Sequence, residues 1–372
     1  MKVGLDATPL LGRRTGVGRY VAGLLGGLRS LPRPPEVVLT AFTWRGAAPL
    51  RAEPGVTVAG RRAPARLLQQ SWQRLGQPPV EWLCGPVDVF HATNFVLPPT
   101  RRAAGVVTIA DLSFERHADT VSAATLRYRA LVPLSLRRAA VICAITSSLA
   151  DDIAEQYALD RERIAVTTLG VGEEWFDVVA PDASRRAALG LPEQYVVFVG
   201  TQEPRKNLPV LLDAYAALLA ADRSFPPLVL VGPSGWGPAL ETTRLPAGAV
   251  VVPGFLDDES LRRTVAGAAA LVLPSRHEGF GLTPLEALAC GTPVVVSDLP
   301  PLREVLGEQA TYVPVGDVDA LADALARAVA DGRGDPAAQA ARRAQARQHT
   351  WAECARVTMS AYEQAVRIRA AR

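Results

Sequence analysis

The chain has 372 residues, of which 49% are hydrophobic and 21% are charged. This length exceeds what one ordinary core requires, so two domains of about 170–190 residues are expected. No apolar run reaches the roughly eighteen residues that a membrane span needs, and the early Asp6 argues against a signal peptide. The composition therefore argues against an integral membrane protein and favours a cytoplasmic location.

The net charge of +3 is unevenly distributed along the chain. Residues 1–140 contain 19 Lys and Arg against 8 Asp and Glu, a net charge of +11, which leaves −8 for the remainder. A basic N-terminal half favours an anionic partner, either a membrane surface or an acceptor linked to a lipid phosphate. Nucleic acid is not expected, because no basic motif interleaved with aromatic residues accompanies the charge.

The first segment predicts a buried strand at Lys2–Asp6, followed by a glycine-rich turn and a helix. The turn, Thr15-Gly16-Val17-Gly18-Arg19-Tyr20, opens a helix that is expected to end near Ser30. It does not fit a dinucleotide fingerprint, because Val21 stands where the third glycine would be. A glycine-rich turn at a helix start still suits phosphate, and a simple tight turn is the alternative.

Strands are next expected at 37–42 and 56–58, before a basic amphipathic helix at about 66–76. In this helix Arg66 and Arg74 accompany Leu67, Leu68, Trp72 and Leu75, and Arg61 and Arg62 precede it. Two interpretations remain open. The helix lies peripherally on the anionic inner face of a membrane, or it is a surface helix with a solvated arginine face.

Two further predicted strands are followed by polar residues. Val87–His91 leads to Asn94, and Val106–Ala110 leads to Asp111. The carboxyl ends of parallel strands face the ligand crevice, so His91, Asn94 and Asp111 are candidate site residues. A structural role is the alternative for His91.

The first half closes with a strand at Ala140–Ile145, a helix over Asp151–Tyr157 capped by Ser147 or Ser148, and a strand at 164–169. The polar stretch Asp177–Pro192, with a proline near each end, is the expected domain linker.

The second half opens with a strand at Tyr195–Val199 and the motif Gly200-Thr201-Gln202-Glu203-Pro204-Arg205-Lys206-Asn207. An adjacent arginine and lysine at the end of a strand can neutralise the two charges of a diphosphate. Only Lys2 and Lys206 are lysines among the forty basic residues, so a lysine inside this motif draws notice. A solvated charge pair at a helix start is the alternative.

The stretch Pro274–Asp298 contains the most informative pattern. A buried strand, Ala268–Leu273, enters the turn Glu278-Gly279-Phe280-Gly281, and a helix follows with Thr283 as its expected N-cap. Free N–H groups and the helix dipole suit an anion at this position. Glu278 and Glu286 instead suit neutral hydroxyls, which donate hydrogen bonds to carboxylates. The pattern therefore predicts a nucleotide-sugar site.

Further strands are expected at 228–232, 250–254 and 293–297, and the chain beyond Pro336 is expected to be helical. Asp317-Val318-Asp319 formally fits a metal-binding D-x-D motif. It is expected instead to cap a helix at Ala320–Ala330, because it follows Gly316 and directly precedes that helix. No cluster of metal ligands is apparent elsewhere, and no cofactor is expected.

The two glutamates, spaced as E-x7-E within EGFGLTPLEALACGTPVV, resemble those of the retaining glycosyltransferases of family 4. The segments GTQEPRKN and HATNFVLPP resemble mannosyltransferase-like members of that family. The resemblance covers nearly the whole chain and implies the α/β GT-B fold, with two Rossmann-like parallel-sheet domains facing across a cleft. It implies an acceptor domain at 1–178, a nucleotide-sugar domain at 192–349, and a helix at 350–372 that crosses back.

The resemblance also implies a reaction and its site. A hexose would be transferred with retention to a hydroxyl of a glycan or lipid-linked acceptor, and the first candidate is mannose from GDP-mannose. The product would belong to the synthesis of a cell-surface polysaccharide or glycoconjugate. The implied catalytic residues are Glu278, Arg205, Lys206 and Asp111. The implied donor-binding residues are Gly16, Thr201, Arg205, Lys206, Phe255, Leu256, Glu278, Gly279, Phe280, Gly281, Leu282, Thr283 and Glu286. His91 and Asn94 are the candidates on the acceptor side.

One residue departs from the family pattern. Where relatives read T-I-H-D, this chain has Ala110, and in relatives that histidine lies near the C6 hydroxyl of the donor sugar. A transferase for rhamnose or another deoxysugar therefore remains an alternative, beside a UDP-hexose transferase. The main rival within enzymes is a sugar-nucleotide epimerase of the GT-B fold; a phosphorylase is disfavoured by the length of the chain. The alternative outside enzymes is a nucleotide-sugar sensor, which would bind the donor and neither hydrolyse nor transfer it.

Overall fold

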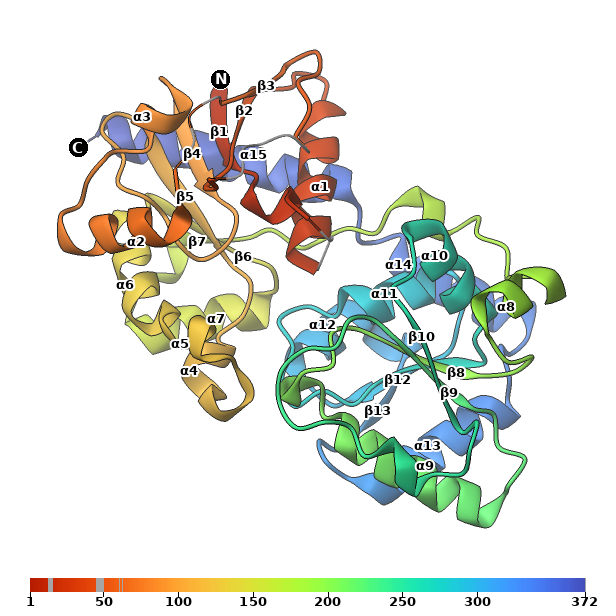
Figure 1. Cartoon of the computed structure of the whole chain (residues 1–372). Coiled ribbons are helices and arrows are strands. Elements are labelled where there is room, and N and C mark those ends of the chain that lie inside the picture. Colours follow the sequence, from red (N-terminus) through yellow and green to blue (C-terminus); the bar gives the residue numbers. More distant parts are fainter. Residues whose placement is uncertain (13–15, 45–49, 60, 62, 372) are drawn as a thin grey trace. The chain divides into compact units, whose positions relative to one another are not determined.

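A computed structural model describes residues 1–12, 16–44, 50–59, 61 and 63–371. The chain forms two compact units. Unit 1 comprises Met1–Arg116, Ala123–Gly170 and His349–Arg372, and unit 2 comprises His117–Ser122 and Val171–Gln348. Each unit has its own parallel sheet covered by helices (Figure 1), so the predicted α/β class with two Rossmann-like sheets is confirmed. Thr15 and Arg62, which the sequence analysis names, lie outside the described residues.

The sheet of unit 1 has seven strands in the order β3-β2-β1-β4-β5-β6-β7, and every neighbouring pair is parallel. The strands are β1 (Lys2–Asp6), β2 (Glu36–Thr40), β3 (Val56–Val58), β4 (Val89–Ala92), β5 (Ala104–Ile109), β6 (Val141–Ala144) and β7 (Ile164–Val166). All seven form where the sequence predicts strands. The central strands β4, β5 and β6 are buried at every residue, as expected of a parallel sheet between two helical layers.

Helices cover both faces of this sheet. They are α1 (Gly16–Arg29), α2 (Ala65–Arg74), α3 (Glu81–Cys84), α4 (Ser113–Arg116), α5 (Ala123–Leu126), α6 (Tyr128–Arg138), α7 (Ser147–Tyr157) and α15 (Trp351–Ala370). Two consecutive residues of β4 identify the layers, because neighbouring side chains of a strand point to opposite faces. Phe90 packs toward Phe42, which in turn contacts Trp72 of α2, whereas His91 contacts Tyr362 of α15.

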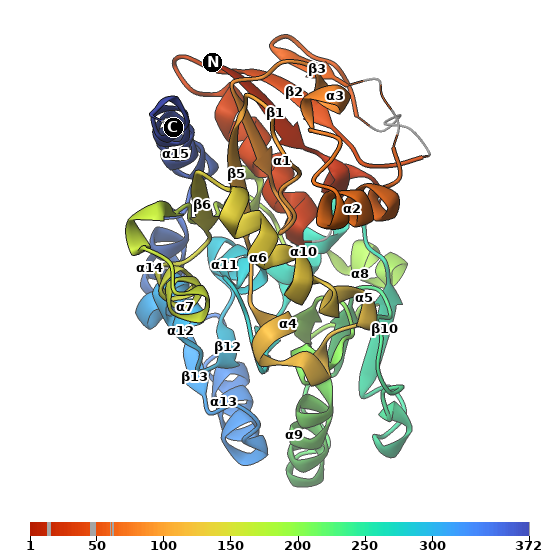
Figure 2. The same cartoon turned by 90° about the vertical axis from the view of Figure 1, so that its left-hand side faces the viewer.

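The last helix of the chain packs closely against the first. A Cβ atom added to Gly23 of α1 would lie 2.2 Å from the ring of Trp351, and one added to Gly27 would lie 2.2 Å from the Trp351 carbonyl. Only glycine at these two positions leaves room for the first turn of α15. The pair α1 and α15 therefore forms one layer of unit 1, beside β5 and β6 (Figure 2).

A buried polar chain ties this layer to the sheet. His91 is fully buried; its Nδ1 lies 2.7 Å from the hydroxyl of Tyr362, and its Nε2 lies 2.7 Å from Oγ1 of Thr108. Thr108 is in turn 2.8 Å from the hydroxyl of Tyr20. Both ring nitrogens are thus engaged inside unit 1, which favours the structural alternative for His91. Its contact with an acceptor stays a prediction.

We expect His91 to make the protein less stable as the pH falls. Burial lowers the pKa of His91 to about 3 from 6.5, so below pH 6.5 the unfolded chain takes up a proton that the folded chain refuses. The free energy of unfolding should decline by about 2 kcal/mol from this group between pH 6.5 and pH 5. Urea denaturation of wild type and His91→Gln at pH 8, 6.5 and 5 checks this. An equally steep decline in both proteins would contradict it.

The sheet of unit 2 has six parallel strands in the order β10-β9-β8-β11-β12-β13. The strands are β8 (Val196–Val199), β9 (Leu228–Val231), β10 (Val250–Gly254), β11 (Ala270–Leu273), β12 (Val294–Ser297) and β13 (Thr311–Val313). The helices are α8 (Ala183–Leu189), α9 (Leu208–Ala221), α10 (Asp258–Gly267), α11 (Leu282–Ala289), α12 (Pro300–Leu306), α13 (Val318–Ala330) and α14 (Pro336–Ala346). In Figure 1, α9 and α13 cover one face of this sheet, and α10 and α11 cover the other.

Helix caps show where the sequence predictions were right and wrong. Asp317 caps α13 as predicted, because its Oδ1 accepts the N–H of Ala320 at 2.9 Å. The cap of α7 is Thr146, whose Oγ1 accepts the N–H of Leu149 at 3.3 Å, and neither Ser147 nor Ser148. Thr146, two residues after β6, has an extended backbone that directs its hydroxyl toward the helix, whereas the two serines already lie inside α7.

Two other segments differ from expectation in detail. β13 is not predicted by the sequence, because Thr311–Val313 is short and its first residue is exposed. The polar stretch 177–192, expected to be a linker, contains α8, and Asp182 caps that helix. The long segment of unit 2 begins before this stretch, at Val171, directly after Gly170 of unit 1.

None of the helices in the described part of the chain combines the length and the apolar character needed to cross a membrane.

Candidate functional site

The candidate site lies at the centre of the sheet of unit 2. β8 and β11 are neighbours there, although the chain forms β9 and β10 on the other side of β8 between them. The loops that leave the carboxyl ends of β8 and β11 therefore start side by side. In open α/β sheets such a reversal of strand order opens the crevice that binds ligands.

The loop after β8 presents Arg205 and Lys206. Both lie in a short 3₁₀ turn, Pro204–Lys206, and Asn207 then adopts a left-handed conformation with φ of 56° before α9 begins. The loop after β11 is attached to this turn by its backbone, because the N–H of Arg276 donates to the carbonyl of Arg205 at 2.9 Å. The two basic side chains are thus held on a turn that is fixed at both ends.

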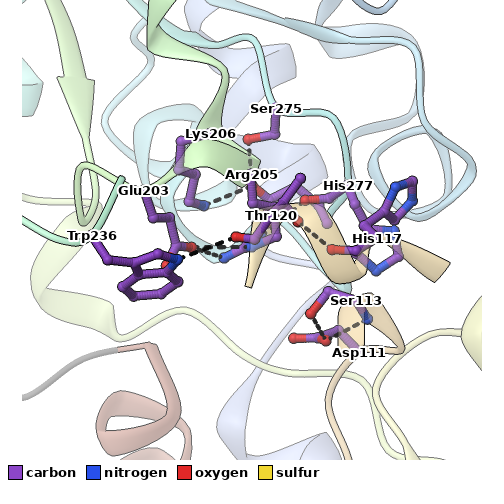
Figure 3. Close-up of polar contacts among 11 residues, drawn as sticks. Asp111, Ser113, His117, Thr120, Glu203, Arg205, Lys206, Trp236, Ser275 and His277 are labelled. Atoms are coloured by element: carbon purple, nitrogen blue, oxygen red, sulfur yellow. Dashed lines mark hydrogen bonds and ion pairs between the residues drawn. The ribbon is translucent and has the colours of Figure 1, made fainter. Parts of the chain in front are cut away.

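The carboxylate of Glu278 is surrounded by three donors. Lys206 Nζ lies 2.7 Å from its Oε1, Arg205 Nη1 lies 3.0 Å from its Oε2, and Ser275 Oγ donates to Oε1 at 2.6 Å. Arg205 also forms an ion pair with Glu203 at 2.6 Å and donates to the carbonyl of His277 at 2.9 Å. Figure 3 shows the side chains of Glu203, Arg205, Lys206 and Ser275 close together.

Burial strengthens this network. The side chains of Lys206 and Glu278 are only 13% and 8% exposed, so their charges interact with little screening by water. Burial alone would raise the pKa of Glu278, but Lys206 and Arg205 outweigh it and hold this pKa at about 2. Burial lowers the pKa of Lys206 below its usual value, while Glu278 acts in the opposite direction. Near neutral pH the carboxylate is therefore ionised.

Two members of the network were not singled out by the sequence analysis. Glu203 lies inside the quoted motif before Arg205, and its side chain is 8% exposed. Ser275 is fully buried and directly follows Pro274. Glu203 could have been identified from the sequence, because a carboxylate two residues before a functional arginine can pair with it. Ser275 could not, because nothing in the sequence distinguishes a single serine in a loop.

The start of α11 requires a glycine. Gly281 has φ of +91°, and an added Cβ atom would lie 2.3 Å from a methyl carbon of Leu302. Gly281 is the N-cap, without a side-chain hydrogen bond, so the predicted capping role of Thr283 is wrong: Thr283 already lies inside the helix. The left-handed glycine turns the chain directly into α11. Phe280, directly before this glycine, is buried, with 3% of the residue exposed.

The other predicted donor residues of unit 2 also follow carboxyl ends of its strands. Thr201 follows β8 and is partly exposed, while Phe255 and Leu256 follow β10, with Phe255 57% exposed. Gly279 lies two residues before the N-cap Gly281, and Leu282 is the first residue of α11. Glu286 lies within α11 and is 3% exposed. No group of three His, Cys, Asp or Glu side chains in the described residues is arranged to hold a metal ion.

The predicted residues of unit 1 gather at the carboxyl edge of its own sheet. Asn94 follows β4 and Asp111 follows β5, where Asp111 Oδ1 accepts the N–H and hydroxyl of Ser113 at 2.9 and 2.6 Å. Asn94 hydrogen-bonds Tyr128, and burial raises the pKa of this tyrosine. Asp6, at the end of β1, belongs to the same edge and is 6% exposed. The rule that selected Asn94 and Asp111 also fits Asp6, which the sequence analysis passed over.

Gly16 begins α1 of unit 1. Its expected contact with the donor diphosphate stays a prediction.

The arrangement around Glu278 can exchange partners. The carboxylate of Glu278 is paired with the two cations that an anion would need. A diphosphate, with more charge and more acceptor oxygens, would draw Arg205 and Lys206 toward itself. Glu278 would then be available to accept hydrogen bonds from hydroxyl groups. The site therefore suits a ligand that combines a diphosphate with a polyol.

Comparison with known proteins gives matches over both halves of the chain. Residues 15–170 match a family model described as a glycosyl transferase 4-like domain, and residues 193–331 match one described as glycosyl transferases group 1. An O-antigen chain mannosyltransferase B from Escherichia coli is 31% identical over 289 residues, which is 74% of each chain. A D-inositol 3-phosphate glycosyltransferase from Jonesia denitrificans is 33% identical over 61% of this chain and 58% of its own.

A solved structure shares the fold over nearly the full length. Sucrose-phosphate synthase from Thermosynechococcus elongatus superimposes with a TM-score of 0.72 at 20% identity and covers 98% of both chains. At this identity the likeness bears on the fold alone.

Proposed function

This chain belongs to the group 1 glycosyltransferases, and we propose that it transfers a hexose with retention from a nucleotide donor to a hydroxyl group. The first candidate donor is GDP-mannose. The proposed acceptor is a glycan or lipid-linked saccharide in the synthesis of a cell-surface polysaccharide or glycoconjugate. The similarity to an O-antigen mannosyltransferase supports both choices.

The observation that carries this proposal is the network of Arg205, Lys206 and Glu278 at the reversal of strand order in unit 2. Arg205 and Lys206 bind the diphosphate and stabilise the charge that develops on it as it leaves. Glu278, released from the two cations, orients the sugar through its hydroxyls. The backbone N–H groups at the start of α11 add positive potential at the same place.

The proposed reaction breaks the bond between the anomeric carbon and the diphosphate oxygen, and forms a bond to the acceptor oxygen on the same face. The acceptor proton passes to an oxygen of the leaving diphosphate. None of the chain's carboxylates is assigned as a covalent nucleophile. Asp111 and Asn94 are proposed to serve the acceptor side from unit 1, and His91 is omitted because its nitrogens are already engaged.

A thermal-shift series tests the donor directly. GDP-mannose, GDP-rhamnose, UDP-glucose and UDP-galactose are compared with GDP and UDP, because a ligand that binds only the folded protein raises its Tm. We expect GDP-mannose to give the largest shift. If none of these compounds shifts the Tm, the proposal that unit 2 contains a nucleotide-sugar site is wrong.

The donor sugar depends on Ala110, at the end of β5, where relatives have a histidine. A site that pairs with a hydroxyl discriminates strongly in its favour, and a site without that partner loses the preference. We expect Ala110→His to keep or raise kcat/KM with GDP-mannose. Steady-state kinetics with GDP-mannose and GDP-rhamnose measure this.

The same variant distinguishes the alternative. If the native donor is a 6-deoxysugar, the added imidazole crowds the pocket or remains unpaired, so activity with that donor falls. A gain confined to GDP-mannose would remove the deoxysugar hypothesis. A UDP-hexose donor, the remaining transferase alternative, would be revealed by the thermal-shift series. A sensor would bind a donor and neither hydrolyse nor transfer it.

A membrane contact through α2 is proposed for the basic N-terminal half. Leu68 and Trp72 of this helix are buried in unit 1, whereas Leu67 and Leu75 are 60% and 74% exposed beside the exposed Arg66. An exposed basic and apolar surface suits an anionic lipid interface.

We expect the protein to float with vesicles that contain anionic phospholipid, and to dissociate as salt rises. Replacing Arg61, Arg62, Arg66 and Arg74 together by glutamine should abolish flotation. A matched control replaces four exposed arginines elsewhere in unit 1, Arg33, Arg51, Arg137 and Arg367, by glutamine. Equal flotation with neutral and anionic vesicles would argue for a soluble acceptor.

A further inference from the structure

A cavity of about 920 Å³ opens in unit 1 at the edge of the sheet opposite to Asn94 and Asp111. Lys2 at the start of β1, Asp88 directly before β4 and Ala104 at the start of β5 line it, so it lies at the amino ends of these strands. A strand of six residues separates the two edges by roughly 20 Å. The cavity is therefore distinct from the proposed acceptor edge, and its volume is that of a small-molecule site.

The lining carries an excess of positive charge. Four basic residues, Lys2, Arg101, Arg102 and Arg369, face two acidic ones, Glu81 and Asp88, which leaves a net charge of +2. Within the described residues, none of these four basic side chains forms an ion pair with a carboxylate. An anion in the cavity would therefore meet cations that are not already neutralised at short range.

The two carboxylates serve the local backbone. Glu81 Oε1 accepts the N–H groups of Arg101, Arg102 and Ala103 at 2.8, 2.8 and 3.0 Å. Burial would raise the pKa of Glu81, but these hydrogen bonds hold it below its usual value. Asp88 accepts the backbone N–H of Lys2 at 2.7 Å.

The carboxylate of Glu81 holds the backbone of residues 101–103 in a tight loop. This loop fixes the backbone positions of two consecutive arginines, Arg101 and Arg102. The last turn of α15 is attached to the same loop, because Arg369 donates to the carbonyl of Arg101 at 2.7 Å. Two guanidinium groups on a fixed loop suit phosphate or carboxylate groups, which they can bind in pairs of hydrogen bonds.

The other walls are apolar. Trp82 lines the cavity with a side chain that is 65% exposed, and Pro79, Pro86 and Val366 complete the lining beside it. The backbone around Trp82 is fixed, because Arg61 donates to its carbonyl at 2.6 Å. A flat exposed ring beside fixed cations favours a ligand that has both an anionic group and a ring or other apolar face.

We propose that this cavity is a second saccharide site, which binds a glycan segment bearing phosphate or carboxylate groups at a distance from the place of transfer. It would keep an anionic chain attached to unit 1 while another part of that chain is extended. The inference rests on the proposed function only for the choice of a glycan. The test of this second site measures binding and not transfer. The second site can therefore be wrong while the transferase assignment is right, and the transferase assignment can be wrong while the second site is right.

The test uses the full-length protein and isothermal titration calorimetry. The probes are a phosphorylated mannose tetrasaccharide, its dephosphorylated form and a uronate tetrasaccharide. The variant Arg101→Gln with Arg102→Gln keeps the backbone N–H groups that Glu81 needs, so it should fold normally. Arg33→Gln with Arg51→Gln is the control, because it removes the same charge from exposed positions elsewhere in unit 1.

We expect the Arg101, Arg102 variant to bind the anionic probes on the order of 10–100-fold more weakly, since two charge-assisted contacts are lost. The control should bind them like wild type, and Trp82→Ala should weaken them severalfold. Transfer to a short neutral acceptor should be unchanged. Stronger binding of the phosphorylated or the uronate probe identifies the anionic group.

Equal affinity of the Arg101, Arg102 variant and wild type would overturn the proposal. An equal loss in the control would also overturn it, because general charge attraction would then explain the binding. If the variant loses only flotation with anionic vesicles and no saccharide binds, the cavity is a lipid-headgroup site instead.

Discussion

Replacing Lys206 with alanine should lower kcat/KM by on the order of 10²–10³, the effect of removing one preorganised donor from a developing oxyanion. Lys206 lies 2.7 Å from Glu278 in a largely buried setting, and the diphosphate is proposed to replace that carboxylate as its partner. The loss should appear mainly in kcat if the lysine acts on the leaving group. Steady-state kinetics with the donor that the thermal-shift series identifies give both constants.

Two further variants serve as controls for Lys206→Ala. Lys206→Arg should recover only part of the activity, because a planar fork does not reproduce a compact point charge. Arg185→Ala removes an exposed ion pair with Glu259, at 3.3 Å on the same unit, and should leave kcat/KM unchanged. Near wild-type turnover by Lys206→Ala would show that this lysine is structural.

Replacing Glu278 with glutamine should affect both stability and binding. The change keeps the shape of the side chain but removes the negative charge between Arg205 and Lys206. Because the pKa of Glu278 is about 2 in the folded protein, against an ordinary value of 4.5, its ionisation stabilises the fold by about 3 kcal/mol at neutral pH. We expect the variant to lose about that much free energy of unfolding, measured by urea denaturation at pH 7.

The pH dependence of the free energy of unfolding tests whether ionised Glu278 stabilises the fold. A carboxylate with a depressed pKa contributes its stabilisation above pH 4.5 and loses it as the pH falls from there toward 2. Wild type should therefore lose stability more steeply than Glu278→Gln between pH 5 and pH 3. Parallel curves would show that the two cations do not stabilise this carboxylate.

The same variant tests the exchange of partners. Without Glu278 as a competing anion, GDP should raise the Tm of Glu278→Gln more than that of wild type, while transfer is lost because the sugar is no longer oriented. A smaller shift than in wild type would mean that Glu278 supports the diphosphate and does not compete with it.

Much of the fold could be predicted because parallel strands form from continuous apolar runs. Most of the strands lie in such runs, whereas the strand that was not predicted, β13, is short and partly exposed. Caps were less predictable. Thr146, Ser147 and Ser148 are all suitable N-cap residues by type, and the backbone conformation selects between them.

For the site, the sequence indicated which residues lie at the ends of strands but not which partners they have. Arg205 and Lys206 were predicted to face a diphosphate, and Glu278 to face hydroxyls. The contact between them depends on the neighbouring positions of β8 and β11, which are far apart in the chain. The same limit applies to His91, because its partner Tyr362 lies in the last helix.

Product analysis with purified protein tests whether the chain transfers a hexose with retention. GDP-mannose and a mannose-terminated oligosaccharide are incubated with the protein, and the product is examined by NMR together with the amount of GDP released. We expect one new glycosidic bond for each GDP released, with the anomeric configuration of the donor, and almost none with Lys206→Ala. Binding of nucleotide sugars without transfer or hydrolysis, or a product of inverted configuration, would contradict it.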